Sequence, residues 1–222
     1  MSSKSARFRL TGRERWRLKK WYTVTAPTVF GSIPVTTTPS DEPWKLLGRI
    51  VEITLYDLTG DITQVHVHLY LQVYKVDPNK FEAYTVFKGH ELARDYLRSL
   101  TRRKSSKITA IVDVATKDGY VLRPTIMAWT TYRCSTSQRH SIRRIMMDLL
   151  TKIAAEKTFD EFVTGMVFGD LVTEIFNEIK KIYPVRKVEF TKSKLLQVPT
   201  GEGPKKAAII PRPGVLEAIF GG

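Results

Sequence analysis

The amino-acid sequence predicts an α+β fold, with a mostly antiparallel, β-barrel-like sheet, helices packed at one side and a basic N-terminal arm. Two observations predict this class. Strand-like segments joined by local turns fill most of residues 21–132, and helical periodicity dominates residues 137–182. Strands followed by grouped helices are typical of α+β proteins, and local hairpins favour an antiparallel sheet that could close into a barrel.

The basic arm comes first in the chain. Its twenty residues contain eight Lys or Arg and one acid, with too few apolar side chains to offset the entropy of ordering them. Aromatic residues lie among and just after the basic ones. Phe8 and Trp16 are suited to stack on exposed bases, whereas we expect Trp21 and Tyr22 to anchor the first strand in the core. The arm favours nucleic acid as the partner.

Seven segments have the extended pattern of β-strands. Apolar and polar side chains alternate along them, as they do in half-buried strands. The predicted strands are residues 21–30, 49–57, 62–76, 81–87, 107–116, 120–132 and 185–198. Asp118 and Gly119 both tolerate a positive φ, so they predict a tight hairpin.

Turn and loop residues separate these strands. Residues 31–45 are rich in Pro and Thr and predict a loop, and residues 57–61 predict a turn. We expect Gly89 to end the strand before it, because glycine weakens a strand interior.

Three helical segments follow from the 3.6-residue period. The first is residues 91–100, and the second extends from a Ser137 cap to about residue 156. Thr158 and Glu161 form a capping-box pattern for the third, which ends before Pro184 near residue 182. Gly165 and Gly169 are its expected points of interruption.

The positive charge is clustered. The formal net charge is +14, yet residues 51–87 hold two basic groups and five acids, and residues 145–185 hold four and seven. Residues 88–144 hold thirteen basic groups and four acids, and residues 186–222 hold seven and three. A surface tuned only for solubility would spread its charge, so this clustering favours a polyanionic partner.

Arginine suits phosphate because its planar fork bonds two oxygens at once. Arg139 and Arg143 lie four residues apart without an intervening carboxylate, so they repel one another unless phosphate neutralises them. The candidate nucleic-acid-binding residues are Arg7, Arg9, Arg13, Arg15, Arg17, Lys19 and Lys20 in the arm, Arg98, Arg102, Arg103 and Lys104 at the first helix, Arg133, Arg139, Arg143 and Arg144 around the start of the second, and Lys192 and Lys194 in the last strand.

Metal and cofactor chemistry have little support in the sequence. Cys134 is the only cysteine, which excludes an internal disulfide and fits a reducing compartment. His66 and His68 share one side of a strand, but further ligands are remote, so packing or bonding to a neighbour is the expected role. We expect no cofactor, no metal and no membrane partner for a soluble, intracellular protein.

Enzymatic activity also lacks a motif. There is no glycine-rich phosphate loop, nucleophile elbow or His–Glu zinc motif. An RNA-processing enzyme would need paired carboxylates near the basic residues, and Glu91 and Asp95 are better interpreted as intrahelical partners of Arg94 and Arg98. The other alternative is a free RNA-binding factor that binds its RNA partners only transiently.

Several strings in the chain resemble an archaeal and eukaryotic small-subunit ribosomal protein family, called S-one-e or S-three-a-e. The similarity extends over about residues 19–199, and the local sequence is similar to that of archaeal members. It rests on KKWYTVTAP at 19–27, GRIVEITLYDLTGD at 48–61, FKGHELARDYLRSLTRRKSS at 87–106, ATKDGYVLR at 115–123, SQRHSIRRIM at 137–146, KTFDEFVTGMVFG at 157–169 and KIYPVRKVEFTKSKLLQVP at 181–199.

The resemblance implies a structural, non-enzymatic protein of the cytoplasmic ribosome. It implies a β-barrel body on the platform of the small subunit, near the messenger exit and the 3′ end of the small-subunit rRNA. The implied partners are small-subunit rRNA, neighbouring platform ribosomal proteins and messenger RNA near the exit. We therefore expect an rRNA-binding arm at 1–20, a body at 21–199 and a C-terminal extension at 200–222.

Overall fold

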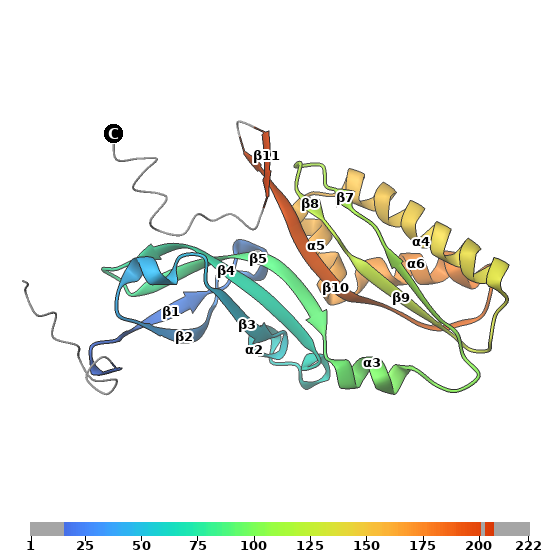
Figure 1. The fold of residues 1–222 in the computed structure, drawn as a ribbon, viewed down its shortest axis with the longest axis horizontal. Coiled ribbons are helices and arrows are strands. Elements are labelled where there is room, and N and C mark those ends of the chain that lie inside the picture. Colours follow the sequence, from blue (N-terminus) through green and yellow to red (C-terminus); the bar gives the residue numbers. More distant parts are fainter. Residues whose placement is uncertain (1–15, 201–202, 207–222) are drawn as a thin grey trace, which may run out of the picture.

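The computed structural model describes residues 16–200 and 203–206, which form a mixed α+β fold around a branched sheet of eleven strands (Figure 1). The strands are β1 (Lys20–Thr25), β2 (Pro34–Ser40), β3 (Ile50–Thr54), β4 (Val67–Asp77), β5 (Glu82–Leu92), β6 (Lys107–Ile111), β7 (Val114–Ala115), β8 (Val121–Leu122), β9 (Thr125–Thr130), β10 (Val185–Thr200) and β11 (Gly203–Lys206). The α-helices are α2 (Tyr56–Thr59), α3 (Arg94–Leu100), α4 (Thr136–Glu156), α5 (Phe159–Phe168) and α6 (Asp170–Lys180), and short 3-10 helices are η1 (Thr28–Phe30), η2 (Pro43–Leu46) and η3 (Ile62–Gln64).

Two half-sheets meet at a single pair of strands. The first half-sheet has the order β2-β1-β5-β4-β3, and the second has β10-β9-β6 together with the short β7–β8 hairpin. Strand β5 pairs with β10 over only three residue pairs, Gly89 to Lys194, His90 to Ser193 and Glu91 to Lys192. Every strand pair is antiparallel except β1 with β5.

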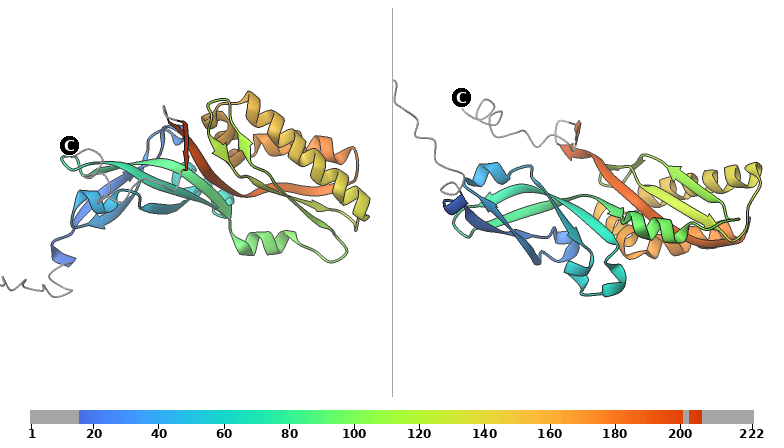
Figure 2. Two further views of the ribbon diagram at one scale, coloured as in Figure 1. Left: turned by 45° about the horizontal axis from the view of Figure 1, so that its top comes forward. Right: turned by 60° about the horizontal axis from the view of Figure 1, so that its bottom comes forward.

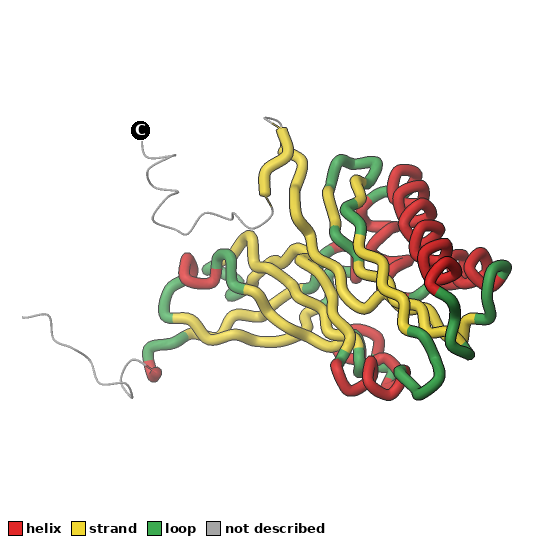
Figure 3. The backbone as a smooth tube through the Cα atoms, turned by 45° about the vertical axis from the view of Figure 1, so that its right-hand side comes forward, coloured by secondary structure: helices red, strands yellow, loops and turns green. Residues whose placement is uncertain are grey.

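The sheet is open, so the predicted β-barrel-like closure is wrong (Figure 3). Strands β2, β3 and β6 each have one neighbour and form free edges. The physical reason lies in β5, which pairs with β1 at residues 82–84 and with β10 at residues 89–91. This change of partner makes the sheet branch into two half-sheets where a barrel would close on itself.

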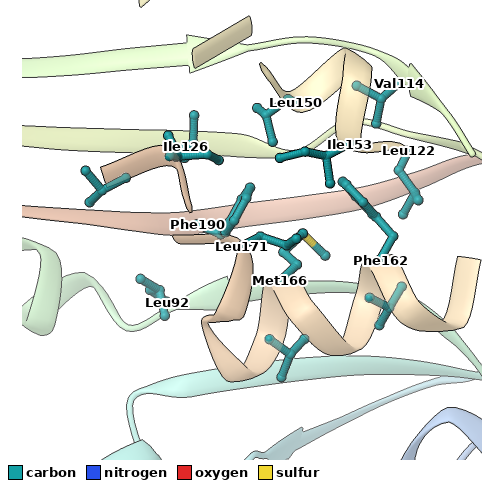
Figure 4. Packing of buried hydrophobic residues seen from close by; sticks show 14 of the residues in the cluster. Leu92, Val114, Leu122, Ile126, Leu150, Ile153, Phe162, Met166, Leu171 and Phe190 are labelled. Atoms are coloured by element: carbon teal, nitrogen blue, oxygen red, sulfur yellow. The ribbon is translucent and has the colours of Figure 1, made fainter. Parts of the chain in front are cut away.

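The three long helices lie beside the second half-sheet, as all views show (Figures 1 and 2). Helix α4 contacts β6 and β7, and α6 contacts β10 and α4. Figure 4 shows Phe162, Met166 and Leu171 of the helices gathered with Ile126 and Phe190 of the sheet. All five are buried, and full burial of such side chains contributes roughly 1.5–3 kcal/mol each.

The helix-capping residues lie at or near the positions that the sequence predicts. Thr158 and Glu161 form the predicted capping box of α5. Helix α4 begins two residues earlier than predicted, because Ser135 accepts from the Gln138 backbone while the Gln138 side chain accepts from Ser135. In the described part of the chain, no helix combines the length and apolarity needed to cross a membrane.

Only one of the two predicted glycine interruptions occurs. Gly169 has φ of 97° and separates α5 from α6, a backbone conformation that glycine adopts without strain. Gly165 continues α5 and is buried, and a Cβ added there would lie 3.0 Å from Leu171 Cγ. It therefore allows the two helices to pack closely.

Three local predictions in the first half of the chain are wrong. Residues 31–45 contain the edge strand β2, which tolerates Pro34 and Pro39 because only one side of it is paired. The strand predicted at 62–76 begins only at Val67, because the Asp61 side chain accepts from Thr63 N at 3.0 Å and starts a 3-10 turn. The helix predicted at 91–100 begins at Arg94, since β5 continues to Leu92.

Gly89 lies inside β5 and does not end it. A Cβ at this position would lie 2.3 Å from the backbone oxygen of Ser193 on β10. Glycine thus marks a close approach of two backbones, which no sequence rule distinguishes from a break.

His90 is buried at the same junction and is fully bonded. Its Nε2 lies 3.1 Å from the Phe190 carbonyl, and its Nδ1 lies 2.7 Å from Ser193 Oγ. Because a carbonyl can only accept, Nε2 carries the proton and Nδ1 accepts from the Ser193 hydroxyl. Burial lowers the pKa of His90 to about 4, so the ring is neutral near pH 7.

We expect Gly89→Ala to destabilise the fold by about 3 kcal/mol, because the new methyl group forces β5 and β10 apart. Urea unfolding measures this change in the free energy of unfolding. The control is Lys88→Ala at the preceding residue, where the natural side chain already has a Cβ. Its free energy of unfolding should stay within about 1 kcal/mol of that of the natural sequence. Equal midpoints for the two variants would contradict the close approach.

Acidification should destabilise the protein through His90. The stabilisation from the neutral ring is complete above pH 6.5, decreases as the pH falls towards the folded pKa of about 4, and levels off below it. The total loss is roughly 3 kcal/mol. Urea unfolding between pH 7 and pH 4 should show a weaker pH dependence for His90→Gln, whereas the exposed His140→Gln should retain it.

Candidate nucleic-acid interface

Two basic clusters that are distant in sequence lie at one end of the molecule. The loop after α3 contains Ser106, which hydrogen-bonds to the end of β9 and to the loop before α4. These bonds hold the two loops against one another. The Ser106 carbonyl accepts from Thr130 N at 3.0 Å, and its hydroxyl accepts from Cys134 N at 3.2 Å. Trp129 Nε1 donates to Thr101 Oγ1 at 3.2 Å and holds the start of the loop.

We call this surface the basic end. Its members are Arg102, Arg103 and Lys104 from the first loop and Arg133, Arg139, Arg143 and Arg144 from the second loop and the first turns of α4. All are exposed except Arg139, which is half-buried. Within the described residues, none of them forms an ion pair with a carboxylate. Their mutual repulsion is therefore uncompensated by the protein.

Two of these arginines are held by the protein itself. Arg143 Nε donates to the Thr109 carbonyl on β6 at 2.9 Å, so this side chain also has a structural role. Arg139 Nη2 donates to Thr136 Oγ1 at 3.2 Å, while its Nε is buried without a partner in the described residues. A buried donor that lacks an acceptor is costly, and an anion bound from outside would supply one.

Arg98 lies on α3 and has a carboxylate neighbour. Its Nη1 is 3.7 Å from Asp95 Oδ1, with both side chains largely exposed, so the pair adds little stability. The prediction that Glu91 is an intrahelical partner is wrong. Glu91 belongs to β5 and accepts from Lys192 Nζ at 2.8 Å.

Lys192 and Lys194 lie on β10, beside the junction with β5 and away from the basic end (Figure 1). Lys194 lines a hollow of 580 Å³ with Lys88 and Arg123. Partial burial and then the positive charge of Lys194 lower the pKa of Lys88. Sequence reasoning missed Lys88 and Arg123, because only the pairing of β5 and β8 with β10 brings them near Lys194.

Arg123 is largely committed to a neighbour. It binds Asp113 in a two-pronged pair at 2.5 and 2.6 Å, and this hydrogen bonding lowers the pKa of Asp113. The hollow thus contains one neutralised arginine and two lysines. It is a weaker phosphate site than the basic end.

The arm is described only from Trp16 onwards, so Arg7, Arg9, Arg13 and Arg15 lie outside the described residues. Arg17 and Lys20 are exposed, and Lys19 Nζ lies 4.6 Å from the ring centre of Trp16. The expectation that Tyr22 anchors β1 in the core is confirmed, since it is 2% exposed. The same expectation is wrong for Trp21, which is 57% exposed.

The histidines on β4 and before it have structural roles. His66 stacks on Tyr96 with ring centres 3.8 Å apart, and burial lowers its pKa. His68 Nδ1 lies 3.2 Å from Glu52 Oε1. The described residues contain no group of three His, Cys, Asp or Glu side chains that could hold a metal ion.

A cavity of 350 Å³ lies between β4, β5, β10 and the junction of α5 with α6. Most of its polar groups are bonded within the protein, as His90 is to Ser193, and Lys187 Nζ is to Glu189 Oε1 at 2.9 Å. Its walls include the apolar Leu92 and Phe176.

Comparison with known proteins shows which family the chain is similar to. The model of the Ribosomal S3Ae family matches residues 9–199. The chain is 55% identical to small ribosomal subunit protein eS1 of Ignicoccus hospitalis, over 94% of this chain and 99% of the relative. It is 56% identical to the eS1 protein of Desulfurococcus amylolyticus, over 93% and 96%, and 57% identical to that of Staphylothermus marinus, over 92% and 96%.

Replacing Arg133 and Arg144 with Gln should weaken binding to structured, largely double-helical RNA. Each lost phosphate contact should reduce the slope of log K against log salt by roughly one, and the double variant by roughly two. Filter binding over a salt series measures both quantities. Lys117→Gln with Lys152→Gln removes the same charge from exposed positions near the other end of α4, and this control should retain the slope.

Proposed function

This chain belongs to the Ribosomal S3Ae family, and from that premise we propose that its basic end binds small-subunit rRNA. The protein is a structural component of the small ribosomal subunit, not an enzyme, and works in the ribosomes of the cytoplasm. The proposal concerns how it does so: which surface binds rRNA, and where on the subunit it lies.

The convergence of two loops at Ser106 supports the proposal most strongly. It brings cations from residues 102–104 and 133–144 to one surface, with no carboxylate partner in the described residues. Phosphate would relieve their repulsion and would supply an acceptor for Arg139 Nε. Contacts of this kind position a protein on RNA without reading its sequence.

The family resemblance supports a place on the platform, near the messenger exit and the 3′ end of the rRNA. We propose that neighbouring platform proteins contact the body, and that messenger RNA passes near it. The division into an arm at 1–20, a body at 21–199 and an extension at 200–222 stays a prediction. So do rRNA contacts by Arg98, Lys192 and Lys194, and by the arm.

An RNA-processing enzyme is disfavoured by the arrangement of carboxylates. At α3, Asp95 pairs with Arg98 and Glu91 lies on a different element. Among the described residues there is also no group of three His, Cys, Asp or Glu side chains that could hold a catalytic metal ion.

The protein should sediment with the small ribosomal subunit through a sucrose gradient at both low and high salt, because several contacts made at once keep a structural component bound even when salt weakens each of them. Blotting gradient fractions of a native lysate for this chain tests it. Migration as a free, light species at both salts would contradict the structural role in the ribosome. Release by mild salt would favour the alternative of an RNA-binding factor that only visits the subunit.

A further inference from the structure

Two exposed tryptophans touch one another at the start of β1. Trp16 is 56% exposed and Trp21 is 57% exposed. Their ring centres are 6.4 Å apart and their planes are nearly perpendicular, at 88°. Single exposed apolar side chains are ordinary, but two large aromatic rings in contact and in solvent indicate a binding surface.

The strand itself holds Trp21 outwards. Along β1, Tyr22 and Val24 are buried, so Trp21 lies on the opposite face of the strand. Its partner on β2 is Pro39, and β2 is a free edge of the sheet. The ring is therefore presented at the rim of the first half-sheet, where the core cannot cover it.

Positive charge surrounds this pair of rings. Lys19 Nζ lies 4.6 Å from the ring centre of Trp16, which is cation–π distance. Arg17, the next residue in the chain, is exposed, whereas Lys20 Nζ lies 5.5 Å from the ring centre of Phe81, on the other face of β1. Residues 13–20 contain five basic groups and one acid. An apolar protein partner would have to desolvate these cations, whereas a nucleotide brings both a flat ring and a phosphate.

We propose that Trp16, Lys19 and Trp21 form a stacking site for unpaired RNA bases. This inference rests on the proposed function as an RNA-binding ribosomal protein and names a second kind of contact for it. Because the two rings are perpendicular, they cannot sandwich one base, so each open ring face takes its own base. The neighbouring phosphates then lie on Arg17 and Lys19.

This site differs from the basic end in place and in the RNA it binds. The start of β1 and the start of α4 lie at opposite ends of the molecule (Figure 1). Bases inside a duplex are already stacked on their neighbours, so the tryptophan site requires a single strand. The basic end contacts phosphates and does not require unpaired bases.

The test uses the full-length protein and a ten-residue oligouridylate, whose bases are weakly stacked. Affinity is measured by fluorescence anisotropy, together with quenching of the tryptophan emission. Trp16→Leu with Trp21→Leu should weaken binding at least tenfold, and replacing both with Tyr should restore most of it, because Tyr also stacks. Trp44→Leu removes another half-exposed tryptophan, 50% exposed on η2, and should change the affinity less than twofold.

Several outcomes would overturn the inference. Equal oligouridylate affinity of the double Leu variant and the natural sequence would do so. A double Leu variant that binds oligouridylate normally but no longer sediments with small subunits would also overturn it, because the two rings would then contact a protein. Trp16 lies before β1, so Trp16→Leu alone should leave the strand intact and should show part of the loss of oligouridylate affinity. This single variant keeps the test valid if the double variant misfolds.

The two proposals fail in different ways. If the natural sequence sediments with the small subunit but its tryptophans do not respond to oligouridylate, only the stacking site is wrong. If it sediments as a free species, the ribosomal role fails whatever the oligonucleotide does. Duplex RNA of equal length should bind the double Leu variant as tightly as it binds the natural sequence.

Discussion

The close approach of β5 and β10 is the constraint on which the rest of the structure depends. Three residue pairs join the half-sheets, and at one end of them Gly89 lets the Ser193 carbonyl come nearer than any side chain allows. His90 bonds Ser193 and Phe190 in the same buried place. Helices α4, α5 and α6 lie beside the second half-sheet. This small junction therefore sets where the three long helices lie relative to β1–β4.

The basic end depends on buried polar bonds in a comparable way. The Ser106 carbonyl accepts from Thr130 at the end of β9, and its hydroxyl accepts from Cys134 in the loop before α4. Without these bonds the two loops would be free to separate, because their arginines repel one another. The fold thus supplies stability at Ser106 and Trp129, and exposes unneutralised charge just beyond them. In the free protein this charge arrangement reduces stability through repulsion, and bound phosphate would remove that repulsion.

Sequence reasoning succeeded where the determinants are local. The Thr158–Glu161 box and the Asp118–Gly119 turn involve residues within three positions of each other. It failed where distant strands decide the outcome. Gly89 was expected to break a strand, Trp21 was expected in the core, and the Pro-rich β2 was expected as a loop; each depends on which strand lies alongside. The basic clusters could be found from composition, but their meeting at Ser106 could not.

The prolines of β2 have a consequence for the protein before it reaches its partners. A free edge strand can pair with the edge of another molecule and so begin aggregation. Pro34 and Pro39 lack the N–H that such pairing uses, so they make β2 a poor template. A ribosomal protein with unneutralised charge and exposed aromatic rings would in this way remain dispersed during the interval between its synthesis and its assembly.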